Sequence, residues 1–205
     1  MIPAQIQLLR PKTADHLSLR ITPSDREYSW EAGQWIDFSV PGQMRMAGYS
    51  ICSPKGQGTF ELLVRRSIHP VTKWLFSDAK IGSSVFISKA SGSCIYNPEE
   101  HQEIVCFAGG VGITPMISMI RTARRLGKKA TLYYAVKDIA NNPYPEEIQE
   151  GDLFVGTRRL SFSQLCRQHT VDTHFFLCGP RNFIDEGVQT LQQCGYKNIH
   201  FERWW

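Results

Sequence analysis

Hydrophobic and polar residues alternate in short runs along the first half of the chain. In the clearest run, residues 35–40 (WIDFSV), Ile36, Phe38 and Val40 are the inward-facing positions. Alternation with a period of two is typical of a strand with one face in a core. Similar runs, separated by Pro, Gly and Ser, predict strands at residues 4–9, 16–22, 35–40, 48–53, 59–65 and 84–88. Six short strands of this kind indicate a six-stranded antiparallel β-barrel, and residues 70–77 indicate one helix that covers an open end.

The pattern changes after Asn97-Pro98, where strands begin to alternate with helices. Apolar residues at helical spacing predict a helix over residues 114–126, with Gly127 as its stop signal. We predict further helices at residues 161–168 and from Pro180 onward, the latter ending before Gly195, and strands at residues 104–108, 130–136, 174–178 and 198–202. Strands alternating with helices give a parallel sheet covered on both faces. The expected fold is therefore two-domain, with a β-barrel over residues 1–97 and a Rossmann-like α/β domain over residues 98–205 that is shortened between 137 and 160.

A glycine-rich stretch, FAGGVGITP at residues 107–115, follows a run that predicts a buried strand. Three glycines let the chain adopt left-handed angles and let a ligand approach the backbone. Thr114 is a suitable N-cap and Pro115 a suitable first helical residue. The free amides at such a helix start favour an anion, typically a phosphate.

Composition narrows the classes of function. The 205 residues are 42% hydrophobic and 20% charged with a formal charge of +4, which fits a folded protein of one or two domains. Lys and Arg are scattered, so we expect no nucleic-acid surface. No stretch is long and apolar enough to span a membrane, and the first residues lack the pattern of a signal peptide. We therefore expect a cytoplasmic protein, and a mitochondrial location stays open if a targeting segment has been removed.

Cysteine and histidine spacing predicts no metal site. The six cysteines form no CxxC pair and no iron–sulfur spacing, so buried free thiols are the expected state. The six histidines also show no metal-binding spacing. Their positions are 16, 69, 101, 169, 174 and 200.

Several segments form a series along almost the whole chain. They are Ala32-Gly33-Gln34-Trp35, Tyr49-Ser50-Ile51, Val64-Arg65, His69-Pro70-Val71-Thr72, GGVGITP at 109–115, Cys178-Gly179-Pro180 and Phe201-Glu202-Arg203-Trp204-Trp205. This series resembles the ferredoxin-NADP reductase family, in which a flavin-binding barrel precedes a nicotinamide-nucleotide domain. The segments GYSICS, HPVTKW and FERWW are similar to one branch of that family, the oxidoreductase NAD-binding domain-containing proteins.

The resemblance implies FAD and NAD(P)H as cofactors and a role for each segment. In the family the tyrosine packs on the flavin, the serine reaches the isoalloxazine edge, and the terminal acidic and aromatic residues lie against the flavin. We therefore expect Ser50, Cys178 and Glu202 to be catalytic. The implied cofactor-binding residues are Arg45, Tyr49, Ser50, Ile51, Val64, Arg65, His69, Val71, Thr72, Gly109, Gly110, Val111, Gly112, Thr114, Pro115, Cys178, Gly179, Pro180, Trp204 and Trp205.

Two departures from the family pattern stand out. An arginine that pairs with flavin phosphate in the family is replaced here by Ala47, two residues before the tyrosine, and Arg45, Arg65 and Arg66 are candidates to compensate. The second departure is the short segment 137–160, in which residues 153–156 predict a small strand. Residues 157–159 (TRR) either approach the adenosine ribose or its 2′-phosphate or form a solvated turn, so NADH and NADPH both stay open.

These observations favour an FAD-dependent NAD(P)H oxidoreductase. A hydride would pass from nicotinamide to flavin, and electrons would pass on to a separate acceptor, either a protein or a small molecule, because the chain has no iron–sulfur cysteines. Two alternatives stay open. One is a flavin reductase that uses flavin as a diffusible substrate, and the other is a nucleotide-binding protein without turnover.

Overall fold

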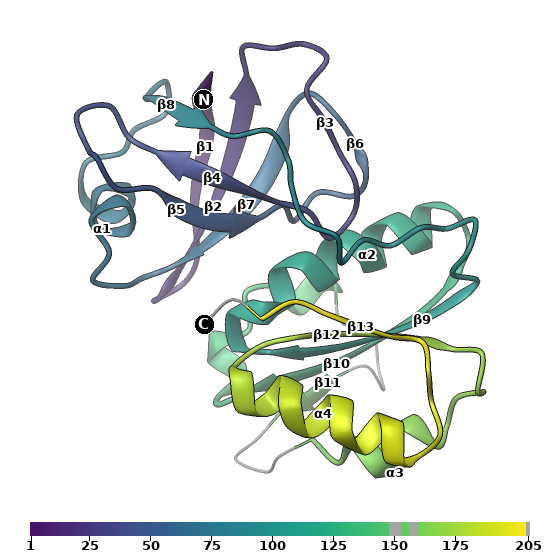
Figure 1. Ribbon diagram of the computed structural model, residues 1–205. Helices are drawn as coiled ribbons and strands as arrows, with labels where there is room; N and C mark the ends of the chain where they lie inside the picture. The colour runs from purple at the N-terminus through teal and green to yellow at the C-terminus, as the bar shows by residue number, and fades with distance from the viewer. Residues whose placement is uncertain (148–152, 156–159, 204–205) are drawn as a thin grey trace.

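The computed structural model describes residues 1–147, 153–155 and 160–203, which are arranged around two main sheets (Figure 1). The first sheet is antiparallel, with strand order β5-β4-β8-β1-β2-β7. A bridge between Ile51 and Leu62 joins its two edges, so the sheet closes into the predicted barrel. Its strands are β1 Ile2–Thr13, β2 His16–Pro23, β4 Trp35–Ser39, β5 Ala47–Ser50, β7 Phe60–Arg65 and β8 Ser84–Ile87. A small additional sheet pairs β3 (Ser29–Trp30) with β6 (Gly56–Gln57), which the sequence did not predict.

Helix α1 (Pro70–Ser77) has the predicted bounds and lies against one end of the barrel. Val71 and Leu75 are buried in the barrel core, because they lie four positions apart on one helix face. His69 is the N-cap residue, and its side chain makes no capping hydrogen bond. The prediction of a helix that covers an open end is confirmed.

The second sheet is parallel, as predicted, with strand order β11-β10-β9-β12-β13. Its central strand is β9 (Glu103–Gly109), flanked by β10 (Lys129–Val136) and β12 (His174–Cys178). The edge strands are β11 (Leu153–Val155) and β13 (Ile199–Phe201). Parallel strands end at the same edge of the sheet, so the glycine-rich segment after β9 and the Cys-Gly-Pro segment at the end of β12 become neighbours.

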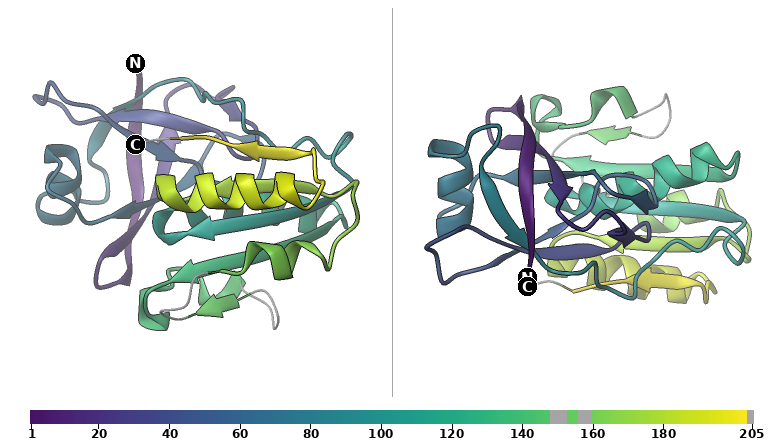
Figure 2. Two further views of the ribbon diagram at one scale, coloured as in Figure 1. Left: turned by 60° about the horizontal axis from the view of Figure 1, so that its bottom comes forward. Right: turned by 90° about the horizontal axis from the view of Figure 1, so that it is seen from above.

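Helices cover both faces of this sheet (Figure 2). Alternate residues of β9 explain the two layers: Ile104 and Cys106 pack in the core that α2 (Ile113–Arg125) covers, whereas Val105 and Phe107 pack in the other core. The second face is covered by α3 (Phe162–Cys166), which is shorter than predicted, and by α4 (Arg181–Gln193). None of the helices within the described residues is long and apolar enough to cross a membrane.

The predicted N-cap and first helical residue of α2 are each two residues too late. Residues 110–112 form a 3₁₀ turn that continues directly into the helix, so Gly112 is the N-cap and Ile113 the first helical residue. The Thr114 hydroxyl donates to the Val111 carbonyl oxygen, 3.0 Å away, and is not a cap. Pro115 is the third helical residue, where its missing amide still costs no intrahelical bond.

The shortened segment after β10 folds back toward the barrel. It forms two 3₁₀ turns, η2 (Ile139–Asn141) and η3 (Pro145–Glu147), before the predicted short strand, which is confirmed as β11. Tyr144 is fully buried, and its hydroxyl donates to Glu61 of the barrel across 3.1 Å. The segment therefore connects the parallel sheet to the barrel.

Candidate functional site

A cleft of about 830 Å³ opens at the carboxyl ends of β9, β10 and β12. The parallel sheet contributes residues 109–111 and 134–137 to its wall, and α4 contributes Asn182 and Glu186. The barrel contributes Asp15, His16 and Arg65. Ligands of open α/β sheets bind at this edge, so the cleft lies where the fold favours a nucleotide.

The three glycines at the end of β9 and in the turn that follows it occupy their positions for different structural reasons. Gly110 has a φ of +56°, and a Cβ at this position would meet no atom within 4 Å, so its backbone is open to the cleft. Gly112 instead packs on the neighbouring strand, because a Cβ there would lie 2.3 Å from the Cys178 carbonyl oxygen. Gly109 lies against Pro180 and Phe183. The sequence prediction of backbone open to a ligand therefore fits Gly110, whereas packing explains the other two.

A second, small cavity of about 50 Å³ lies where the two halves of the molecule meet. Val111 lines both this cavity and the large cleft, so the two are neighbours. Tyr49 and Ser50 of the barrel line it opposite Gly112 and Cys178 of the parallel sheet. The structure thus brings predicted site residues from three separate segments into one place.

The barrel side of this junction contains a polar group without a partner. The Tyr49 hydroxyl and the Thr72 hydroxyl are hydrogen-bonded at 3.0 Å, which connects β5 to α1. Burial raises the pKa of Tyr49 to about 12, so the phenol stays protonated near neutral pH. Nδ1 of His69, at the start of α1, is buried and makes no hydrogen bond. A buried polar atom beside free helix amides is the arrangement that a phosphate oxygen would satisfy.

Glu202 connects the two halves at the other side of the junction. One of its carboxylate oxygens accepts hydrogen bonds from the backbone amides of Ser93 and Cys94, at 3.0 and 3.2 Å. Glu202 also lines a very small cavity together with Ser50 and Cys178. The three residues predicted to be catalytic therefore lie together, although they come from β5, β12 and the segment after β13.

The Cys178 side chain is a protonated thiol in this environment. Burial, followed by the nearby Glu202 carboxylate, raises its pKa to about 12. A thiolate, which is the nucleophilic form of cysteine, is therefore absent near neutral pH. Cys178 can act as a small neutral side chain at the junction and not as a nucleophile. All six cysteines are free, as predicted.

Thr114 and Pro115, buried at the start of α2, each line one of the two small cavities of the junction. Other predicted site residues lie outside the junction. Ile51 and Val64 are fully buried in the barrel core. Arg45 is exposed and pairs with no acidic residue among those that the structure describes. The remaining predictions, Trp204, Trp205 and residues 156–159, lie outside the described residues.

Sequence reasoning missed several residues of the cleft wall. Asp15 lies in the turn between β1 and β2, and His16 is the first residue of β2, far from every motif in the sequence. Lys137 and Asn141 follow β10, in the segment whose shortness was noted. The position of Lys137 directly after the second predicted strand was the one available signal, because ligands bind at strand ends.

Comparisons with known proteins agree with this arrangement. No protein-family model matches the chain. The chain is 27% identical over 249 aligned positions to oxidoreductase NAD-binding domain-containing protein 1 of Xenopus laevis, covering 99% of this chain and 79% of that protein. The resemblance to this branch, drawn above from the sequence, is therefore confirmed.

Solved structures confirm the fold. Phthalate dioxygenase reductase superimposes with a TM-score of 0.87 and 22% identity, over 98% of this chain and 67% of that one. The flavohem-like FAD/NAD binding domain of nitric oxide dioxygenase from Vibrio cholerae superimposes with a TM-score of 0.83 and 21% identity, over 99% of this chain and 98% of that one. These neighbours are ferredoxin reductase-like proteins, and the second is named for the FAD and NAD that the sequence led us to expect here.

Proposed function

We propose that this protein is an FAD-dependent NAD(P)H oxidoreductase that passes electrons to a separate acceptor. The observation that carries the proposal is that the large cleft and the Tyr49–Cys178 junction are neighbours, with Val111 in the wall of both. A nucleotide held in the cleft could extend its reactive end to the junction. That is the geometry a hydride transfer between two ring systems requires.

The residues of the barrel fit a flavin nucleotide. The unpartnered Nδ1 of His69 and the first amides of α1, at Val71 and Thr72, would hold the pyrophosphate. Tyr49, fixed by its hydrogen bond to Thr72, would pack against the ring. When bound, the flavin supplies the chemistry of accepting a hydride and releasing electrons.

The residues of the parallel sheet fit a dinucleotide. The open backbone at Gly110 would approach the pyrophosphate, while Cys178 and Glu202 would border the nicotinamide. Because Cys178 is a neutral thiol, it would exclude water without competing chemically for the hydride. Glu202 is already fixed by two backbone amides, so its carboxylate needs no reorganisation to act at this position.

The acceptor is expected to be a separate molecule. The given sequence has no cysteine spacing for an iron–sulfur cluster. The structure of phthalate dioxygenase reductase is described as modular, for electron transfer from pyridine nucleotides to [2Fe–2S]. By analogy, we propose a redox protein or a small molecule as the acceptor of this chain.

One observation favours a second candidate, a reductase that uses flavin as a diffusible substrate. Ala47 stands where the family has a phosphate-binding arginine, and Arg45 is exposed. Loss of a charge-assisted phosphate contact costs about 1.5–3 kcal/mol, or more than about tenfold in affinity. Weak flavin retention would convert a bound cofactor into a substrate.

An absorption spectrum of the purified chain, recorded anaerobically before and after addition of NADH or NADPH, tests the proposal. A bound flavin band that bleaches supports it and identifies the preferred nucleotide. A colourless protein that oxidises NAD(P)H only with added flavin supports the second candidate. Bound flavin that neither nucleotide bleaches would contradict both, as would a lack of NAD(P)H oxidation with flavin and a dye acceptor present.

A further inference from the structure

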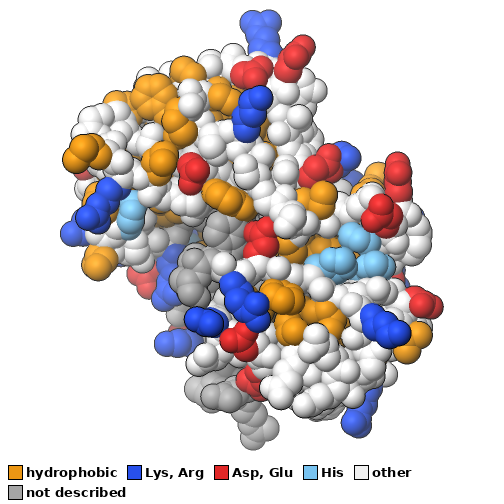
Figure 3. Space-filling model, viewed as in Figure 1, with side chains coloured by type: hydrophobic (Ala, Val, Ile, Leu, Met, Phe, Trp, Pro, Cys, Tyr) orange, Lys and Arg blue, Asp and Glu red, His pale blue; other side chains and the backbone are white. Residues whose placement is uncertain are grey.

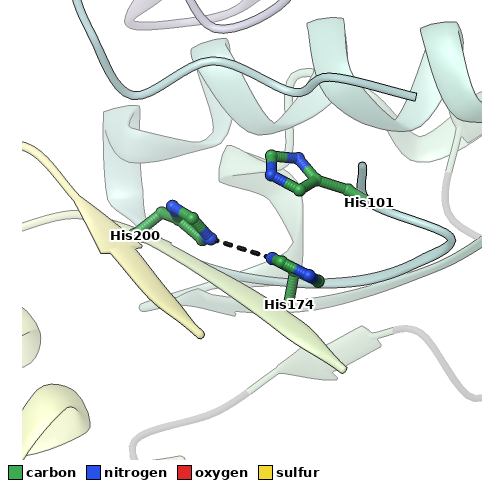
Figure 4. Close-up of side chains that lie close together, drawn as sticks. All are labelled: His101, His174 and His200. Carbon is green, nitrogen blue, oxygen red and sulfur yellow. Dashed lines mark hydrogen bonds between the residues drawn. The ribbon is translucent and has the colours of Figure 1, made fainter. Parts of the chain in front are cut away.

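Three histidines that are far apart in the sequence meet on one face of the parallel sheet (Figure 4). His101 precedes β9, His174 is the first residue of β12, and His200 lies in β13. One ligand atom from each ring lies within 4.8 Å of the other two. Nδ1 of His174 and Nε2 of His200 are 3.0 Å apart and share a hydrogen bond. We call these three residues the histidine cluster.

Strand register explains why the cluster forms. Phe176 pairs with His200 across β12 and β13, and His174 lies two residues before Phe176 on the same face. Stacking of the His200 ring on Phe176, with centroids 4.6 Å apart, fixes the orientation of this imidazole. His101 covers the pair, with its ring centroid 4.3 Å from that of His174. The three rings are therefore held by packing before any ligand binds.

Solvent can reach the cluster. His101 is buried, but His174 and His200 are only half-buried. Figure 3 shows histidine side chains gathered at the molecular surface on the side of the parallel sheet. Neutral imidazoles have the lone pairs that a metal ion needs.

We propose that His101, His174 and His200 form a binding site for a divalent transition-metal ion of the zinc type. Three imidazole nitrogens are a ligand set that Zn²⁺, Cu²⁺, Ni²⁺ and Co²⁺ accept. Tetrahedral zinc with Zn–N bonds of about 2.0–2.1 Å places its ligand nitrogens about 3.3 Å apart. The separation of 3.0 Å between the His174 and His200 nitrogens is already close to this value. A metal ion would replace the proton that these two rings share.

The protonation state of each ring determines how readily it can bind a metal ion. Nδ1 of His101 accepts a hydrogen bond from the Asn97 amide at 3.1 Å, so the proton of the neutral ring is on Nε2. Binding a metal through Nε2 requires that proton to move and the Asn97 amide to find another acceptor. The pair His174–His200 is therefore the anchor of the site, and His101 is the weakest ligand.

The cluster is separate from the proposed cofactor site. His174 and Cys178 are the first and last residues of β12, so about 13 Å of strand lies between them. A bound metal ion would therefore not touch the nicotinamide. It would connect the segment before β9 to β12 and β13 and thereby stabilise the strand that leads to Glu202.

Titration of the full chain with Zn²⁺, monitored by calorimetry, tests the proposal, with Co²⁺ as the spectroscopic probe. We expect one ion per chain, visible d–d bands of tetrahedral Co²⁺, and none of the near-ultraviolet charge-transfer absorption that cysteine thiolates give. His174→Asn and His200→Gln should each weaken binding by at least about 100-fold, because loss of a ligand costs more than loss of a second-shell partner. His101→Asn should weaken binding less.

His169→Gln is the matched control, because His169 contacts Tyr133 and Glu103 and lies outside the cluster. This variant should bind Zn²⁺ as the parent does. Thermal unfolding of each variant without metal shows whether it folds. The parent and the control should gain the same stability from Zn²⁺, His101→Asn should gain less, and His174→Asn and His200→Gln should gain the least. Equal Zn²⁺ binding by folded His174→Asn and the parent would overturn the proposal, as would a thiolate spectrum with Co²⁺.

Discussion

Arg121 of α2 forms an ion pair with Glu61 of β7, with 2.9 Å between Nη1 and Oε2. The same guanidinium pairs with Glu147 of η3 at 2.7 Å and donates to the Cys52 carbonyl oxygen at 3.0 Å. The Tyr144 hydroxyl adds a donor to Glu61. One arginine thus connects the barrel, the helix after the glycine-rich turn and the shortened segment.

We expect Arg121→Ala to destabilise the protein by about 3 kcal/mol, because both carboxylates remain mostly buried: Glu61 would lose its cationic partner, and Glu147 would keep only the longer ion pair with Arg124, at 3.8 Å. The melting temperature should fall by roughly 6–12 °C for a chain of this size. Arg125→Ala, an exposed position on the same helix, is the control and should change stability by less than about 0.5 kcal/mol. Similar melting temperatures for both variants would show that the ion pairs do not stabilise the fold.

The two glycines of the 3₁₀ turn should respond differently to alanine. In Gly112→Ala the new Cβ would lie 2.3 Å from the Cys178 carbonyl oxygen, which is backbone and cannot move aside. Gly110→Ala introduces no clash but forces a positive φ, at a cost of about 1–2 kcal/mol. Thermal unfolding should therefore show a small loss for Gly110→Ala and a much larger loss, or no folded protein, for Gly112→Ala. The reverse order would contradict the assigned roles.

Much of the fold could be predicted from the sequence, because burial imposes a period of two on strands and 3.6 on helices. The run at residues 35–40 and the helix at 70–77 are examples in which local pattern and tertiary burial agree. The start of α2 was wrong because the capping preference of Thr114 was overridden by the 3₁₀ turn that Gly110 allows.

The candidate site could be predicted only in part. The motifs named Tyr49, Ser50, Cys178 and Glu202, and the structure brings them together. The histidine cluster could not be predicted, because its members meet through strand order and register, which spacing along the chain does not encode. For the same reason the sequence did not predict that Asp15 and His16 line the cleft, because strand order brings them there.

Cys178 should resist alkylation in the folded protein. Burial, followed by the Glu202 carboxylate, raises its pKa to about 12, so the thiol stays protonated as pH rises through 8 and 9. Relative to a free cysteine with a pKa near 8.5, the thiolate fraction at pH 8 falls by about 1,000-fold or more. Iodoacetamide labelling followed by mass spectrometry should modify Cys178 only after unfolding. Rapid labelling of the native protein at Cys178 would show an accessible thiolate instead.

Glu202 can be tested by separating its charge from its hydrogen bonds. Glu202→Gln keeps an oxygen that can accept from the amides of Ser93 and Cys94, whereas Glu202→Ala removes it. We expect Glu202→Ala to lose about 1–3 kcal/mol of stability and Glu202→Gln to lose less. If the charge acts on the nicotinamide, stopped-flow flavin reduction should slow by about tenfold or more in both variants, equivalent to 1.4 kcal/mol. A normal rate in Glu202→Gln would limit the role of Glu202 to holding the loop.

Ala47→Arg should strengthen flavin binding if the missing arginine weakens it. Residues 47 and 49 lie two apart in β5, so an arginine at 47 projects from the same face as Tyr49. One charge-assisted contact to phosphate contributes about 1.5–3 kcal/mol, which predicts an affinity gain of at least about tenfold in fluorescence titrations of the apoprotein with FAD. Ala47→Met controls for side-chain length, and the gain of the arginine variant over it should shrink at high salt, because ions screen an exposed charge pair. Equal FAD affinity of the arginine and methionine variants would mean that the phosphate is held by other groups, with His69 and the first amides of α1 as the nearest candidates.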